Sequence, residues 1–152
     1  MKEIIKEIIG AFVGAGGFSL ILGLRANKVI FAATGGGLCW GICCLVENLV
    51  TDEIILGALI AAAVGTAYSE IIARAVKTPV TGILTPSLIP MVPGGSLYYM
   101  MASLISSERA AAFGYAVATA KWAVGIAAGV TVVTVLARPK GFIRPAHRKQ
   151  TD

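Results

Sequence analysis

The sequence predicts an all-α integral membrane protein with about five transmembrane helices, the fourth broken by a Pro/Gly-rich segment. Of its 152 residues, 57% are hydrophobic and only 14% are charged, whereas charged residues make up about 25% of a soluble domain. The mean hydropathy is +0.82. The apolar runs are continuous and do not alternate with polar residues, which favours helices over a membrane β-barrel. This composition excludes a soluble enzyme, a disordered segment and a nucleic-acid-binding protein.

The apolar runs define five predicted spans, since a helix needs about 20 residues to cross the hydrocarbon core of a bilayer. We expect them at residues 5–24, 29–50, 53–73, 79–106 and 110–137. Charged side chains at the ends of the shorter runs can reach the interface. Residues 1–137 therefore form one transmembrane helical domain, and residues 138–152 form a basic cytoplasmic tail.

The distribution of basic residues predicts the orientation. With five spans, nine of the 13 Lys and Arg residues fall on one side of the membrane. These nine are Arg25, Lys28, Arg74, Lys77, Arg138, Lys140, Arg144, Arg148 and Lys149. Because basic residues are enriched in cytoplasmic loops, we expect a cytoplasmic C-terminus and an N-terminus outside. The chain is thus predicted to be a multi-pass protein of the cell (inner or cytoplasmic) membrane.

The fourth run is unusual in its length and its prolines. Residues 78–107 are uncharged over 30 positions, about ten more than one span needs. The prolines of this run are Pro79, Pro86, Pro90 and Pro93. A proline inside a helix costs about 3 kcal/mol and pushes the preceding residue toward extended geometry. We therefore expect a broken or re-entrant segment, followed by a helix that begins near residues 94–96 and ends near residue 106.

The broken segment is the candidate substrate site. Non-helical backbone at membrane depth persists only where protein or a water-filled cavity surrounds it. In transporters, the N-terminus of such a half-helix binds anionic groups of the substrate. The candidate substrate-binding residues here are Thr85, Ser87, Pro90, Pro93, Gly94, Gly95, Ser96 and Tyr98. The alternative is a Pro-kinked helix that only packs against its neighbours.

Three ionisable residues are candidates for coupling to protons. Lys121 lies near the middle of the last predicted span, where a charge costs about 2.5–3.5 kcal/mol and usually faces a cavity or a partner charge. It is a candidate for both substrate binding and proton coupling. The alternative is that Lys121 pairs with Glu47 or Glu70, or reaches the interface. Glu47 and Glu70 are the other coupling candidates, although their positions near span ends also suit interfacial residues.

Small residues in the spans predict packing rather than chemistry. Three glycine pairs have four-residue spacing, which lets helices approach closely: Gly10/Gly14, Gly37/Gly41 and Gly125/Gly129. We interpret Cys39, Cys43 and Cys44 as buried apolar thiols, because the single histidine, His147, lies in the tail and cannot complete a metal site. The sequence contains no catalytic set, so we expect no enzyme activity, no metal and no cofactor.

The proline-rich stretch resembles a known signature. Its residues are Pro79, Pro86, Ile89-Pro90, Val92-Pro93-Gly94-Gly95, Tyr98 and Met101. They are similar to the signature of the threonine/serine exporter family, in particular its small-subunit (YjjB-like) type, which corresponds to the C-terminal half of the fused exporters. The resemblance implies export of threonine or serine, or of dicarboxylates such as succinate, driven by the proton gradient. It also implies a larger multi-span subunit as partner.

The predicted number of five spans agrees with a chain that works together with a partner subunit. Transporters built from inverted repeats pair two halves of opposite topology, with the site at their interface. Five helices alone give little wall around a substrate cavity, so we expect the chain to be half of a transporter. Two alternatives are a homo-oligomeric channel lined by the Pro-Gly-Gly element and a membrane assembly factor that transports nothing.

Overall fold

The structure is a computed structural model that describes residues 2–49 and 53–137, and its regular elements are all helices. In chain order they are α1 (Lys2–Ile21), α2 (Ala26–Leu49), α3 (Ile54–Ala75), α4 (Val80–Leu88), the 3₁₀ turn η1 (Ile89–Met91), α5 (Gly94–Ile105) and α6 (Arg109–Ala137). Among the described residues, four helices are long and apolar enough to cross a membrane, and α4 with α5 gives a fifth span if the bent pair counts as one. The predicted all-α membrane fold is confirmed. The basic tail predicted at 138–152 lies outside the described residues.

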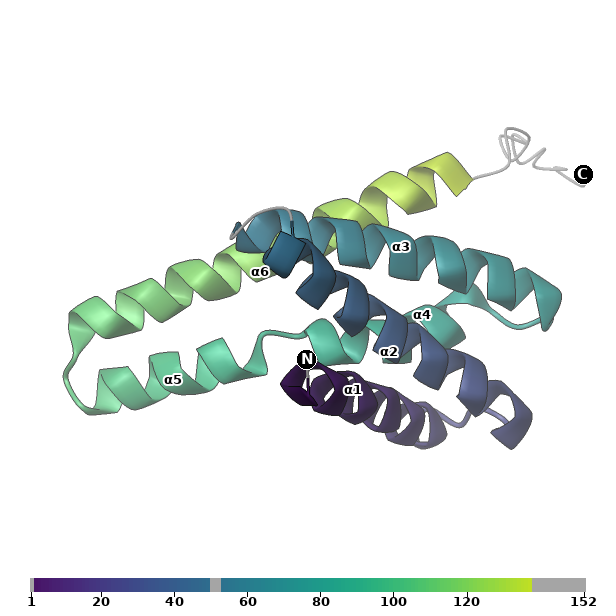
Figure 1. Ribbon diagram of the computed structural model, residues 1–152, viewed down its shortest axis with the longest axis horizontal. Helices are drawn as coiled ribbons and strands as arrows, with labels where there is room; N and C mark the ends of the chain where they lie inside the picture. Colours follow the sequence, from purple (N-terminus) through teal and green to yellow (C-terminus); the bar gives the residue numbers. More distant parts are fainter. Residues whose placement is uncertain (1, 50–52, 138–152) are drawn as a thin grey trace, which may run out of the picture.

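The bundle has a core of small side chains. Helices α1 and α2, α2 and α3, and α3 and α6 pack against each other, while α4 lies against α1, α2 and α3 (Figure 1). The central cluster consists of Cys39, Cys43, Ala58, Ala61, Ala62 and Met91. Large apolar side chains instead point outward, for example Ile21 and Leu136, each 79% exposed. Small residues inside and large ones outside are the pattern expected of helices that pack in lipid.

One of the three glycine pairs confirms the predicted close packing. Gly125 and Gly129 lie directly against the backbone of α3, where an ideal Cβ on Gly125 would be 2.8 Å from the carbonyl oxygen of Ile55. Gly37 and Gly41 face α1 less closely, since an ideal Cβ at either position would make ordinary contact with α1, at 3.5 Å or more from the nearest atom. The third pair differs, because a Cβ at Gly10 or Gly14 would meet nothing within 4 Å.

The turn between α1 and α2 depends on a glycine. Gly23 has a φ of 76°, a left-handed conformation that side chains with a Cβ rarely adopt. The amide N–H of Leu24 donates to the carbonyl of Ser19 at 3.1 Å, which closes the C-terminus of α1. The chain then reverses into α2.

The predicted break in the fourth span is confirmed, and it falls at residues 92–93. Val92 is extended (φ −63°, ψ 126°), Pro93 precedes α5, and the two helical parts are bent by 47°. The expectation that Pro86 and Pro90 also interrupt the helix, each with an extended residue before it, is wrong. Pro86 lies inside α4, and Ile89, which precedes Pro90, is helical (φ −52°, ψ −44°). Pro86 is fully buried, so its packing offsets the lost hydrogen bond.

Helix α6 extends past the N-terminal end of α3. Lys121 Nζ lies 3.9 Å from Glu53 Oε2 at the start of α3, and Arg74 near the end of α3 contacts the carbonyl of Ala137. Residues 121–137 therefore run parallel to α3, and residues 109–120 continue for about 18 Å beyond it at 1.5 Å per residue. Helix α5 packs chiefly against this extension. We call residues 94–120 the α5–α6 arm, and it extends to the left in Figure 1.

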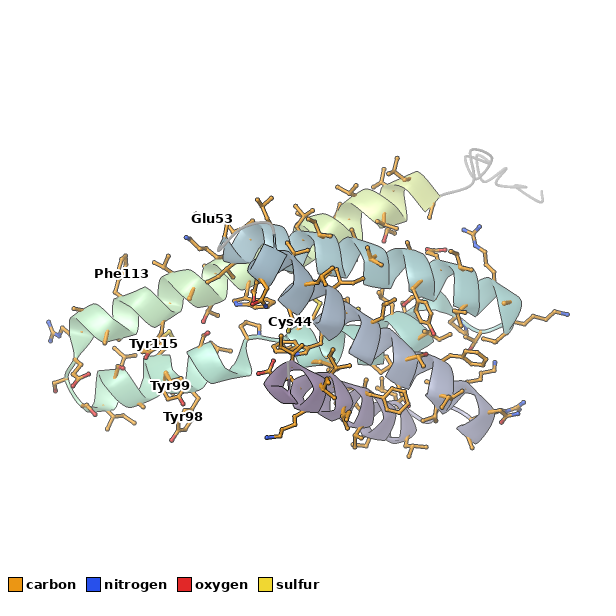
Figure 2. All side chains as sticks on the ribbon, in the orientation of Figure 1. Cys44, Glu53, Tyr98, Tyr99, Phe113 and Tyr115 are labelled. Carbon is orange, nitrogen blue, oxygen red and sulfur yellow. The ribbon has the colours of Figure 1, made fainter. Side chains whose placement is uncertain are left out.

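Aromatic residues hold the arm together and also cover its outer faces. Tyr99 of α5 and Tyr115 of α6 stack with ring centroids 5.6 Å apart, between the two helices (Figure 2). Tyr98 and Phe113 point away from the arm and are 69% and 72% exposed. The arm therefore has an apolar surface that no other described helix covers.

Candidate functional site

A cavity of about 300 Å³, wide open on one side, lies between α1, α2 and η1, and η1 belongs to the broken span. The residues that line it are Glu7, Gly10, Ala11, Gly14, Trp40, Ile89 and Pro90. Gly10 and Gly14 leave space on the α1 side, since nothing lies within 4 Å of an ideal Cβ at either position. The third glycine pair therefore helps to form a cavity instead of a helix contact.

Gly36 of α2 brings the walls of this cavity together. An ideal Cβ at Gly36 would overlap the side chain of Ala15 and lie 3.1 Å from the carbonyl oxygen of Ala11 and 3.4 Å from Cγ of Pro90. Only a residue without a side chain lets α1, α2 and η1 converge at this point.

Glu7 and Trp40 form the polar part of the cavity wall. The indole Nε1–H of Trp40 donates to Glu7 Oε2 at 3.2 Å, and the thiol of Cys44 lies 3.8 Å from the same oxygen. The Trp40 ring stacks on Trp122 of α6 with centroids 6.5 Å apart and planes inclined by 7°. Trp40 is thus held between a carboxylate of α1 and a ring of α6.

Of the predicted substrate-binding residues, Pro90 lines this cavity. Ser87 is buried, and its hydroxyl donates to the carbonyls of Ile83 at 2.8 Å and Ala32 at 3.3 Å, which ties α4 to α2. Thr85 is exposed. The remaining predicted residues lie at or after the start of α5, apart from the cavity: Pro93, Gly94, Gly95, Ser96 and Tyr98. The predicted set is therefore divided between the cavity and the start of the arm.

The ionisable candidates lie at the two ends of the bundle. Lys121 is midway along α6 but level with the first turn of α3, and its partner is Glu53 rather than Glu47 or Glu70. Glu47 lies at the same end, where its Cγ would be 3.2 Å from an ideal Cβ on Gly57 and where the Cys43 thiol donates to its Oε1 at 3.7 Å. Neither residue lines the cavity.

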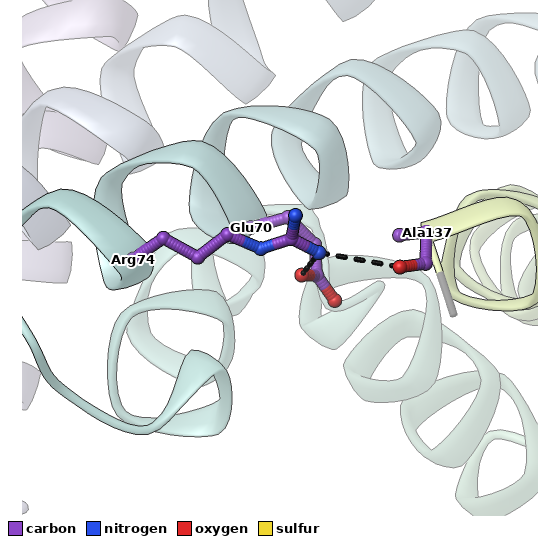
Figure 3. A network of polar contacts seen from close by, with 3 residues as sticks. All are labelled: Glu70, Arg74 and Ala137. Atoms are coloured by element: carbon purple, nitrogen blue, oxygen red, sulfur yellow. Dashed lines mark hydrogen bonds and ion pairs between the residues drawn. The ribbon is translucent and has the colours of Figure 1, made fainter. Parts of the chain in front are cut away.

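Glu70 lies toward the other end of α3. It forms an ion pair of 3.1 Å with Arg74, whose Nη2 also donates to the carbonyl of Ala137 at 3.2 Å (Figure 3). Arg74 therefore connects the end of α3 to the last described residue of α6. The structure does not bring Glu70 together with Lys121 and Glu47.

A second cluster of hydrogen-bonded polar groups lies between α2 and α3. The hydroxyl of Tyr68 is 2.6 Å from that of Thr34 and donates to the carbonyl of Phe31 at 3.0 Å. Gly35 leaves room for the Tyr68 ring, which would be 3.1 Å from an ideal Cβ at that position. No buried side-chain nitrogen or oxygen of the described residues lacks a hydrogen-bond partner. These hydroxyls therefore serve to join helices.

Sequence reasoning missed Glu7, Trp40, Gly10 and Gly14 as cavity residues. Glu7 is the last charged residue before the first apolar run, a position that suits a residue at the interface. Its contact with Trp40 joins two helices across 33 positions, and no local pattern indicates it. The predicted cysteine roles are confirmed, since Cys39, Cys43 and Cys44 are free and buried. Among the described residues, no group of three or more His, Cys, Asp or Glu could hold a metal ion.

A comparison of the sequence with known protein families identifies the family of this chain. Residues 7–136 match the model of a family described as threonine/serine exporter, ThrE. The chain belongs to the threonine/serine exporter family. No curated protein and no solved structure matches it. This exporter-family protein has several helices of membrane-spanning length, so it is a multi-pass membrane protein with a transport role of the threonine/serine-exporter type.

Proposed function

We propose that the chain is one subunit, of the small-subunit type, of a secondary active exporter of small polar metabolites: threonine and serine, or a dicarboxylate such as succinate. The observation that carries this proposal is the cavity of about 300 Å³ next to the broken span. Its volume is at the lower end of the range of about 300–1,000 Å³ for small-molecule sites. Broken helices beside a cavity are typical of substrate sites in secondary transporters.

The α5–α6 arm supports a larger membrane subunit as partner. Its exposed apolar residues include Tyr98, Tyr99, Met101, Leu104, Ile105 and Phe113. The charged pair of Lys121 and Glu53 lies where α3 begins, and the arm continues beyond this level. Contiguous apolar surface of this kind is typical of a contact with protein or lipid. We propose that a second subunit packs on the arm and completes the wall of the substrate path.

The experiment that tests this proposal is a purification from native membranes followed by reconstitution. A tagged chain should co-purify with a larger multi-span subunit in a fixed ratio, measured by native mass spectrometry. The complex in proteoliposomes should then show saturable threonine, serine or succinate flux that depends on a proton gradient. Ohmic single-channel currents from a ring of identical copies would instead favour the channel. Normal flux in membranes that lack the chain would favour the assembly factor.

The start of α5 provides a sharp test of substrate binding by the half-helix. An ideal Cβ at Gly94 meets nothing within 4 Å, so Gly94→Leu should insert and assemble normally. If the N-terminus of α5 contacts the substrate, we expect transport to fall severalfold while the yield of complex stays constant. Both quantities are measured on the same preparation, by flux and by size-exclusion chromatography. Loss of assembly together with transport would favour a packing role of Gly94.

Proton coupling is proposed for Lys121, with Glu70 and Glu47 as the other candidates. Lys121 Nζ lies 3.9 Å from Glu53 Oε2, so an acidic and a basic group lie side by side at that end of the bundle. We expect the Lys121→Ala variant to lose part of the dependence of export on the proton gradient. The measurement is initial export rate against external pH at constant membrane potential. An unchanged pH profile would remove Lys121 from the coupling mechanism and leave the two carboxylates.

A further inference from the structure

We propose that a groove between the C-terminal parts of α3 and α6 binds an anionic phospholipid. The headgroup phosphate lies at Arg74, and an acyl chain lies along the apolar part of the groove. The groove has a volume of about 330 Å³ and shares no lining residue with the cavity at the broken span. The proposal is independent of the exporter function, because it concerns the outer surface of the bundle and not a substrate.

The apolar part of the groove suits an acyl chain. Its lining comes from Ala67 and Ile71 of α3 and from Val133 and Leu136 of α6. Ile71 is 67% exposed and Leu136 is 79% exposed, although both side chains are large and apolar. On helices of membrane-spanning length and composition, such side chains face the hydrocarbon of the bilayer. A groove that is open on this side is therefore open to lipid.

The length of α3 places Arg74 at the surface of the membrane. Helix α3 has 22 residues, with Glu53 directly before its first turn and Arg74 in its last. At 1.5 Å per residue it is about 33 Å long, which is close to the thickness of about 30 Å of the hydrocarbon core. The apolar lining therefore lies at the depth of the acyl chains, and the guanidinium of Arg74 lies at the depth of the headgroups. A ligand that is apolar at one end and charged at the other matches this arrangement.

The contacts of Arg74 leave hydrogen-bond donors for a phosphate. Its Nη2 donates to Glu70 Oε2 at 3.1 Å and to the carbonyl of Ala137 at 3.2 Å. Nη1 and Nε have no hydrogen bond within the described residues, and Figure 3 shows Nη1 pointing away from both partners. The side chain of Glu70 is 18% exposed and that of Arg74 is 64% exposed, so the carboxylate fixes the guanidinium from the protein side. A guanidinium held in this way can bind a phosphate through two parallel hydrogen bonds.

The charge at this end of the bundle favours a lipid with a net negative charge. The start of α2 lies near the end of α3, and the turns there carry further basic residues (Figure 1). Within residues 2–49 and 53–137, Glu70 is the only acidic residue at this end. Each basic residue near an anionic membrane surface contributes about fivefold to affinity. The basic residues of this end are Arg25, Lys28, Arg74 and Lys77.

The test is a lipid titration followed by native mass spectrometry. The full chain is purified in detergent with any subunit that co-purifies, and phosphatidylglycerol is added. Phosphatidylcholine with the same acyl chains tests the role of net charge, and inorganic phosphate tests the role of the acyl chains. We expect phosphatidylglycerol to bind about fivefold more tightly than phosphatidylcholine, and inorganic phosphate not to bind. Equal affinity for the two lipids, or phosphate binding as tight as that of phosphatidylglycerol, would overturn the proposal.

The variants separate the charge of Arg74 from its ion pair. Arg74→Gln should bind phosphatidylglycerol about fivefold more weakly and lose the preference over phosphatidylcholine. Glu70→Gln also breaks the ion pair but keeps the guanidinium, so it should bind phosphatidylglycerol at least as tightly as the wild type. Arg74→Lys keeps the ion pair and loses the two parallel donors, so its affinity should lie between those of Arg74→Gln and the wild type.

A charge control and a melting curve complete the design. Lys6→Gln removes one positive charge at the opposite end of the bundle and should leave the affinity for phosphatidylglycerol unchanged. Added phosphatidylglycerol should raise the melting temperature of the wild type and of Glu70→Gln more than that of Arg74→Gln. Equal losses of affinity in Arg74→Gln and Glu70→Gln, or in Arg74→Gln and Lys6→Gln, would overturn the role of Arg74 in binding the headgroup.

Discussion

The Gly129→Ala variant is expected to melt well below the wild-type protein. Gly129 lies against the carbonyl oxygen of Leu59, and an ideal Cβ would also be 2.9 Å from the backbone nitrogen of Ala63. These are backbone atoms of α3, which cannot move aside as a flexible side chain can. The added methyl group must push α6 away from α3, and overpacking of this kind costs about 1–3 kcal/mol. The loss is measured as the thermal or denaturant unfolding midpoint of the purified chain in detergent.

Gly114 on the same helix provides the matched control. An ideal Cβ at Gly114 meets nothing within 4 Å. Alanine is favoured over glycine in a helix by about 1 kcal/mol, so Gly114→Ala should be neutral or slightly stabilising. The same chemical change is therefore expected to have opposite signs at two positions of α6. Equal shifts in the two variants would show that α6 does not pack on α3 through Gly129.

The Gly36→Ala variant is expected to lose most of its transport. The new methyl group would overlap Ala15 and crowd the carbonyl oxygen of Ala11, both on α1, as well as Pro90 of η1. Helix α1 or η1 must then shift, and both carry residues that line the cavity. Displacements of about 1 Å can cost up to about 100-fold in enzymes. We therefore expect a fall in transport of about tenfold or more, measured as initial flux per assembled complex in proteoliposomes.

Gly17 on α1 is the control for this second prediction. It is exposed, it does not line the cavity, and an ideal Cβ there meets nothing within 4 Å. Gly17→Ala should retain wild-type flux. If Gly36→Ala assembles and transports normally, the contact of α1, α2 and η1 at Gly36 does not shape the substrate path. In that case the candidate site at the start of α5 becomes the stronger one.

The helices themselves could be predicted from local patterns. Hydropathy alone placed the spans at 5–24, 29–50 and 53–73, within a few residues of α1, α2 and α3. Proline chemistry predicted that the fourth span is interrupted before Gly94, and α5 begins at Gly94. Pro86 shows the limit of this reasoning, because it is tolerated inside α4 where it is fully buried. A lost backbone hydrogen bond is a local cost, whereas the packing that offsets it comes from other helices.

The candidate site could be predicted only in part. Pro90 was identified because it belongs to the broken segment, which is a local feature. Glu7 and Trp40 were missed because their contact depends on how α1 and α2 pack. A charged residue at the end of a span is also expected simply because it can lie at the membrane–water interface. Lys121 lies midway along its own helix, but only the offset of α6 against α3 shows that its neighbour is Glu53.

The sequence by itself determined that this protein folds in a membrane, that it consists of helices, and where one of them is broken. These properties depend on composition, run length and the missing N–H of proline, all of which act within one segment of chain. Only the tertiary structure decided which glycines pack and which leave a cavity, and that the α5–α6 arm extends past its neighbours. Those features depend on the relative offset of helices, which many weak contacts between distant residues set together.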